Sequence, residues 1–179
     1  MLQAKITAFT PSSLAALMKE EITFNLWANK RLISWLSEKT RKAPCYQHLL
    51  QLNTALKNIQ CAERYWCDRL CGNLSSVKTR EDSIEQLCEK VLVASSRFAQ
   101  YIKALSDYSF YEEYLVNSGD KEPALLPVYE IVQHALLYSV IQRGQLLNIA
   151  RTLGWNNAPS IDYLSFLMLH ELDMNLERG

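Results

Sequence analysis

Long apolar runs are absent from this sequence of 179 residues. A membrane-spanning helix requires roughly 20 consecutive apolar residues, and the longest candidates here are interrupted by Gln, Asn, Arg or Glu. Near the N-terminus, Thr7 and the residues 10–13 (TPSS) break any signal-peptide core. We therefore expect a cytoplasmic protein that has no membrane partner.

An excess of charge of either sign is also absent, because 19 basic residues balance 19 acidic ones. Proteins that bind nucleic acid usually carry a basic patch or a basic recognition helix, and no stretch of this chain has that pattern. The sequence therefore predicts no nucleic-acid partner. A hydrophobic content of 49% and a charged content of 21% are ordinary for a soluble globular protein.

No CxxC motif occurs among the five cysteines, and their number is odd. This usage suits buried thiols in a reducing compartment better than a disulfide framework. Cys67 and Cys71 lie one helical turn apart, a spacing that favours packing over a metal pair because a metal site needs further ligands. Internal repeats are lacking too, so we interpret residues 1–179 as a single domain.

Five segments have the apolar spacing of helices. Asp82 and Glu85 give one of them the acid-x-x-Glu form of a helix start. Glycine is scarce, with five residues in all, and Gly72 and Gly154 stand where the second and fourth helical patterns end. The predicted helices cover residues 14 to about 39, 47–71, 82–106 and 127–153, and a last one opens at residues 159–160.

Between the third and fourth helical segments the periodicity changes. Residues 110–116 (FYEEYLV) are rich in aromatic side chains, residues 117–120 (NSGD) have the composition of a turn, and residues 121–126 can return as a second strand. Two strands alone are marginally stable, so we expect them to pack against the helices. The sequence thus predicts an all-α helical bundle with a short β-hairpin insertion before the fourth helix and an extra C-terminal helix.

The fourth helical segment carries polar residues within an apolar stretch. Residues 131–149 (IVQHALLYSVIQRGQLLNI) contain His134, Tyr138 and Gln142 at a spacing of four, which stacks their side chains in one row on a helix. Gly144 lies in mid-helix, where glycine costs about 1 kcal/mol relative to alanine, so a close helix or ligand contact would favour it. A buried helix with a polar row is the feature around which we expect a site.

Several short motifs follow one another along the chain. They are residues 24–32 (FNLWANKRL), residues 62–66 (AERYW), Arg69, Leu70, Gly72, His134, residues 143–146 (RGQL) and residues 153–154 (LG). Together they resemble the DinB/YfiT-like superfamily of four-helix-bundle proteins, and the resemblance covers about residues 14–165.

This resemblance implies an up-down-down-up four-helix bundle that is frequently a homodimer. It also implies a divalent metal, such as zinc or nickel, held inside the bundle by three histidines, one from the second helix and two from the fourth. Some members of the superfamily are thiol-dependent transferases or isomerases. A homodimer is therefore an expected arrangement, whereas the superfamily name does not imply DNA binding.

The ligand positions of the family fall on Asn58, Tyr138 and Gln142, and none of these is a histidine. Amide oxygens are poor ligands for zinc or nickel, and a tyrosine would have to lose a proton whose ordinary pKa is about 10. His134 lies one turn before the first ligand position of the fourth helix, so we interpret it as a hydrogen-bonded core residue. The family metal is therefore predicted to be absent, and no other cofactor is expected.

Two functional hypotheses follow, and neither assigns a catalytic residue. In the first, the protein is a non-catalytic or small-ligand-binding bundle. Its Asn58, Tyr138 and Gln142 side chains then form a hydrogen-bonded network or line a pocket for a small molecule. Glu63 and Arg143 are supporting residues that we expect to pair between the second and fourth helices.

In the alternative, the protein is a metal-dependent thiol transferase or isomerase with a rearranged site. Cys61 lies three residues after Asn58 and can point toward the same region as His134, which we also count as a supporting residue. Two such groups do not complete a tetrahedral zinc site. The rearranged site would therefore need further ligands.

Overall fold

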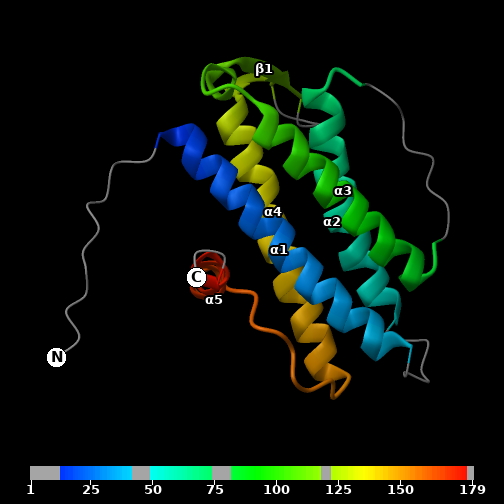
Figure 1. The fold of residues 1–179 in the computed structure, drawn as a ribbon. Coiled ribbons are helices and arrows are strands. Elements are labelled where there is room, and N and C mark those ends of the chain that lie inside the picture. The colour runs from blue at the N-terminus through cyan, green and yellow to red at the C-terminus, as the bar shows by residue number, and fades with distance from the viewer. Residues whose placement is uncertain (1–12, 42–48, 74–81, 118–121, 177–179) are drawn as a thin grey trace.

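The computed structural model shows four long helices side by side, together with a two-stranded antiparallel sheet and a fifth helix (Figure 1). The described residues are 13–41, 49–73, 82–117 and 122–176, without the side chains of Leu49 and residues 170–176. Most of the predicted turn at residues 117–120 lies outside them. The elements are α1 (Leu14–Thr40), α2 (Leu49–Leu70), α3 (Ile84–Ala104), the 3-10 helix η1 (Tyr108–Tyr111), β1 (Glu113–Val116), β2 (Ala124–Pro127), α4 (Val128–Thr152) and α5 (Tyr163–Leu176).

Serine side chains start two of the long helices. Ser13 Oγ accepts a hydrogen bond from a backbone N–H in the first turn of α1 at 3.2 Å, as an N-cap residue does. At the start of α3, Ser83 Oγ accepts from the N–H of Gln86, and Gln86 Oε1 accepts from the N–H of Ser83 at 3.0 Å. The predicted start at Asp82 with Glu85 is therefore wrong by one residue, because Ser83 and Gln86 form the reciprocal capping box.

The two glycines expected to stop helices lie directly behind them. Gly72 has a φ of 74° and Gly154 has a φ of 72°. This left-handed conformation carries no steric penalty for glycine and ends an α-helix. The predicted ends of the second and fourth helices are thus confirmed to within one residue.

The helices pack so that α1 and α2 each contact both α3 and α4. The colours in Figure 1 show that α1 and α4 run in one direction along the bundle, while α2 and α3 run in the other. α5 contacts α1. Within the described ranges, no helix combines the length and the apolar character needed to cross a membrane. The packing directs side chains from all four long helices into a common interior.

A β-hairpin lies between α3 and α4, as predicted, but its strands begin later than expected. β1 and β2 pair antiparallel, with Glu113 opposite Pro127. The first strand is shortened because residues 108–111 form η1, whose Phe110 side chain is fully buried. The second strand begins three residues later than the predicted segment 121–126. The hairpin and η1 thereby close one end of the bundle.

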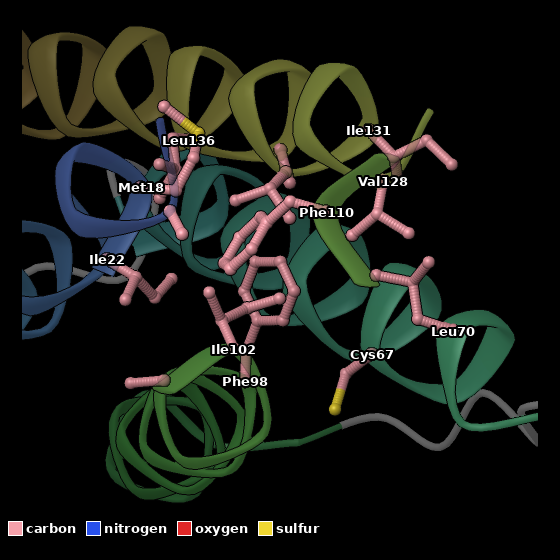
Figure 2. Close-up of a cluster of buried hydrophobic side chains, with 14 residues drawn as sticks. Met18, Ile22, Cys67, Leu70, Phe98, Ile102, Phe110, Val128, Ile131 and Leu136 are labelled. Carbon is pink, nitrogen blue, oxygen red and sulfur yellow. The ribbon is translucent and has the colours of Figure 1, made fainter. Parts of the chain in front are cut away.

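Buried apolar side chains form two clusters. The hairpin-end cluster has Phe98 of α3 and Phe110 of η1 among its members, with side chains of α1, α2 and α4 around them (Figure 2). The far-end cluster contains Leu32, Leu36, Leu52, Leu56, Ile59, Leu87, Val91 and Leu146, among others. Removal of this apolar surface from water is the main force that holds the helices together.

We expect Phe98→Ala to lower the free energy of unfolding by about 3–5 kcal/mol, because it removes a fully buried ring and leaves a cavity. Val93→Ala on the same helix should change this free energy by less than about 0.5 kcal/mol, since Val93 is 67% exposed. Urea denaturation followed by circular dichroism measures both values. Equal losses from the two substitutions would contradict the placement of the core.

Candidate functional site

A layer of buried polar side chains separates the two apolar clusters, and each of the four long helices contributes to it. Every member is at most 3% exposed. Along each helix, the members lie between the residues that the helix gives to the hairpin-end cluster and those that it gives to the far-end cluster. We call this set the buried polar layer, and it consists of Asn25, Asn29, Glu63, Ser95, Ser139 and Arg143.

Glu63 lies at the centre of the layer and accepts four hydrogen bonds. Its Oε1 accepts from Nδ2 of Asn25 at 2.8 Å, from Nδ2 of Asn29 at 3.1 Å and from Oγ of Ser139 at 2.8 Å. Its Oε2 accepts from Oγ of Ser95. A carboxylate withdrawn from water is costly unless its oxygens are satisfied. The four donors therefore make the burial of this charge tolerable.

Arg143 joins the layer from α4. Its Nη1 donates to Oδ1 of Asn25 and to Oδ1 of Asn29, the latter at 2.9 Å. The side-chain oxygen of each asparagine thus accepts a hydrogen bond from the guanidinium, and its nitrogen donates one to the Glu63 carboxylate. The expected direct pairing of Glu63 and Arg143 is corrected, because the two amides connect these charges. Burial lowers the pKa of Arg143 to about 10, against the opposing effect of Glu63, so the guanidinium stays charged at neutral pH.

Two of the three positions that match the family's ligands are joined across α2 and α4. Asn58 Nδ2 donates to Gln142 Oε1 at 3.1 Å, and Gln142 is 4% exposed. Tyr138 lies one turn before Gln142 on α4. It is half-buried and takes no part in this hydrogen bond. The predicted network among the three side chains is therefore limited to the pair of amides.

His134 is exposed and does not lie in the core. Its ring meets Trp66 of α2 edge-on, with the ring centroids 5.7 Å apart. The prediction of a hydrogen-bonded core histidine is wrong, because residues four apart on a helix of 3.6 residues per turn are offset by about 40° around its axis. Over the two steps from Gln142 to His134, this offset carries the polar row from the interior to the surface.

The four described cysteines are free thiols that differ in burial. Cys67 and Cys88 are buried, Cys71 is exposed and Cys61 is half-buried. Burial raises the pKa of the Cys67 thiol to about 12 and also raises the pKa of Cys88, so neither is activated as a thiolate. The Sγ of Cys61 donates to Oε1 of the neighbouring Gln60 at 3.5 Å. The two buried thiols thus lack the environment of a catalytic nucleophile.

Metal-ligating side chains do not gather at the matched positions. Within the described part of the chain, no three His, Cys, Asp or Glu side chains are grouped so that they could hold a metal ion. Asn58 and Gln142 direct their amides at one another, and zinc and nickel prefer imidazole or thiolate ligands to amides. The donor groups present here do not fit the metal that the resemblance implies.

A cavity of about 410 Å³ lies on another side of α4, between α4 and α1, with Tyr163 of α5 at its wall. None of the predicted pocket residues Asn58, Tyr138 and Gln142 lines it. Two members of the buried polar layer, Asn25 and Arg143, do line it. The structure therefore moves the candidate ligand site from the α2-facing side of α4 to the α1-facing side.

Four members of the buried polar layer were not predicted from the sequence. Asn25 and Asn29 are four residues apart within an apolar stretch of α1, which is the kind of signal that singled out the row on the fourth helix. Ser95 and Ser139 give no comparable signal, because a small serine side chain occurs on buried and exposed helix faces alike. The asparagines could therefore have been found by periodicity, whereas the serines could not.

Comparisons of the chain with protein-family models, with curated proteins and with solved structures give no match. Three features of the structure therefore bear on function: the buried polar layer, the amide pair of Asn58 and Gln142, and the cavity between α1 and α4.

We expect Glu63→Leu to lower the free energy of unfolding by about 3–5 kcal/mol, because it leaves the buried Arg143 charge without compensation. Combination with Arg143→Met should restore part of the loss, since both charges are then replaced by apolar groups. A double-mutant cycle from urea denaturation measures the coupling. Strictly additive losses would show that the two charges do not depend on one another.

Proposed function

We propose that this protein is a DinB-like helical bundle that acts by binding a small molecule as a homodimer, without catalysis and without the family's metal. The observation that carries this proposal is the hydrogen bond between Asn58 and Gln142, at two of the three positions where the resemblance implies histidine ligands. The hydrogen bond between these two amides links α2 to α4 and favours one register of the two helices. The amides offer a metal neither imidazole nor carboxylate.

The placement of the motif residues supports the resemblance. Residues 24–32 supply Asn25 and Asn29, residues 62–66 supply Glu63, and residues 143–146 supply Arg143, so three separate motifs meet in one buried polar layer. The helix directions in Figure 1 agree with the up-down-down-up order that the resemblance implies. A shared structural requirement thus accounts for the joint occurrence of these motifs.

We expect untagged protein to contain zinc and nickel far below one equivalent, and the triple variant Asn58→His, Tyr138→His, Gln142→His to gain zinc affinity. Three imidazoles at these positions would provide the ligands that the amides and the phenol do not. Inductively coupled plasma mass spectrometry measures the metal content, and titration against a chromogenic chelator measures the affinity.

The matched control adds His134→Ala to the triple variant, which should leave zinc affinity unchanged because His134 is exposed and is not a matched ligand. No gain of affinity in the triple variant would contradict the ligand mapping. Near-stoichiometric zinc or nickel in the unsubstituted protein would overturn the proposal in favour of the metal-dependent thiol transferase or isomerase.

The outward face of α4 supports the homodimer. Leu137 and Ile141 are each 58% exposed. Gly144 follows one turn later, and a Cβ added there would meet no atom within 4 Å, so no contact within the described residues accounts for a glycine in mid-helix. A glycine allows a close approach of a second backbone. Two copies that cross at Gly144 about a two-fold axis would cover these apolar side chains.

We expect Ile141→Asp to convert the dimer to a monomer, because it places a charge within the apolar contact. Val93→Asp on α3 should leave the dimer intact, since Val93 is also open to solvent, at 67% exposed, but belongs to another face. Size-exclusion chromatography with multi-angle light scattering measures the mass at several concentrations. A monomeric unsubstituted protein throughout that range would refute the dimer.

A further inference from the structure

Arg143 lines the cavity between α1 and α4 and carries two donors that no described acceptor engages. Its Nη1 donates to Asn25 and Asn29, while Nε and Nη2 have no acceptor among the described residues. Nε and Nη2 share one edge of the planar guanidinium, and this edge can bind the two oxygens of a carboxylate by parallel hydrogen bonds. The side chain lines the cavity although it is only 3% exposed.

The guanidinium is held in place before any ligand arrives. The two asparagine oxygens fix Nη1, and the ring of Phe24 lies with its centroid 5.8 Å from Cζ of Arg143. The asparagines are fixed in turn by the Glu63 carboxylate. A ligand that binds the free edge would therefore lose little affinity to the ordering of this long side chain.

The remaining wall of the cavity suits an apolar tail. Leu17 and Phe24 of α1 face Leu136 and Val140 of α4 across it. The ring of Tyr163 packs edge-on against Phe24, with centroids 5.2 Å apart. A volume of about 410 Å³ falls within the range of small-molecule sites.

Among the described residues, Glu21 is the one acidic residue at the cavity wall, and it restricts the charge of the ligand. It makes no ion pair with Arg143 in the described part of the chain, so it does not neutralise the guanidinium. A ligand with a second carboxylate would meet Glu21, and a single carboxylate is therefore favoured.

We propose that this cavity binds an amphipathic monocarboxylic acid, with its carboxylate on the Nε and Nη2 donors of Arg143 and its apolar chain against Leu17, Phe24, Leu136 and Val140. This inference rests on the proposed binding role and assigns it a site and a class of ligand. A bidentate charge-assisted contact at one end and apolar burial at the other together select such a molecule over a neutral or a strongly polar one.

The test uses decanoate as the probe and decanol as its uncharged counterpart, with isothermal titration calorimetry on the full chain. Decanoate is kept below its micelle-forming concentration and decanol below its solubility limit. We expect decanoate to bind at one site per chain. Decanol should bind with an affinity lower by roughly tenfold or more, because it lacks the carboxylate. Equal binding of the two probes, or no binding of decanoate, would overturn the proposal.

Variants locate the site. Leu17→Trp should weaken decanoate binding by roughly tenfold, because the larger ring fills the cavity, whereas Leu50→Trp, at a 70% exposed position on α2, should not weaken it. Arg143→Lys should weaken decanoate binding to a similar extent, because an ammonium group lacks the two parallel donors of the guanidinium. Circular dichroism verifies that this variant keeps its fold. Unchanged binding in Leu17→Trp would overturn the assignment. Metal content and decanoate binding are measured separately, so either proposal can fail without the other.

Discussion

The burial of the Glu63 carboxylate is the constraint on which the rest of the structure depends. Its oxygens are satisfied by donors from α1, α3 and α4, so the three other long helices must all stand in the correct register with α2. A shift of one helix would remove a donor and leave a buried charge partly unsatisfied, which is far more costly than a displaced apolar contact. The apolar clusters above and below supply cohesion, and the buried polar layer selects the alignment.

Different sides of α4 make different contacts, because successive residues of a helix are rotated by about 100° around its axis. Ser139 points into the buried polar layer, Gln142 meets Asn58 of α2, and Val140 lines the cavity beside α1. Ile141 is open to solvent. Arg143 connects two of these sides, since one guanidinium carries the hydrogen bonds of the layer and also lines the cavity. A structural network and a ligand site can therefore share a residue.

Local signals were reliable where neighbouring residues decide the outcome. Gly72 and Gly154 end their helices because the left-handed conformation requires only the glycine itself. The predicted start of α3 lies one residue too early because Asp82 and Ser83 are both good caps, and the sequence alone does not say which of them the following Gln86 will bond. Asn58 could be singled out only through the family resemblance, whereas Gln142 already stands out in the polar row of the fourth helix. Nothing in either helix indicates that the two amides meet.

The amino-acid sequence by itself determined the four long helices, the hairpin between the third and fourth, and the residues available for chemistry, because periodicity and capping act over a few neighbouring positions. Only the tertiary structure decided which polar residues are buried together. The row from His134 to Gln142 rotates out of the core, Asn25 and Asn29 come between Glu63 and Arg143, and the cavity forms beside α1. These outcomes depend on how one helix is rotated against another, which is set by the packing of all four at once.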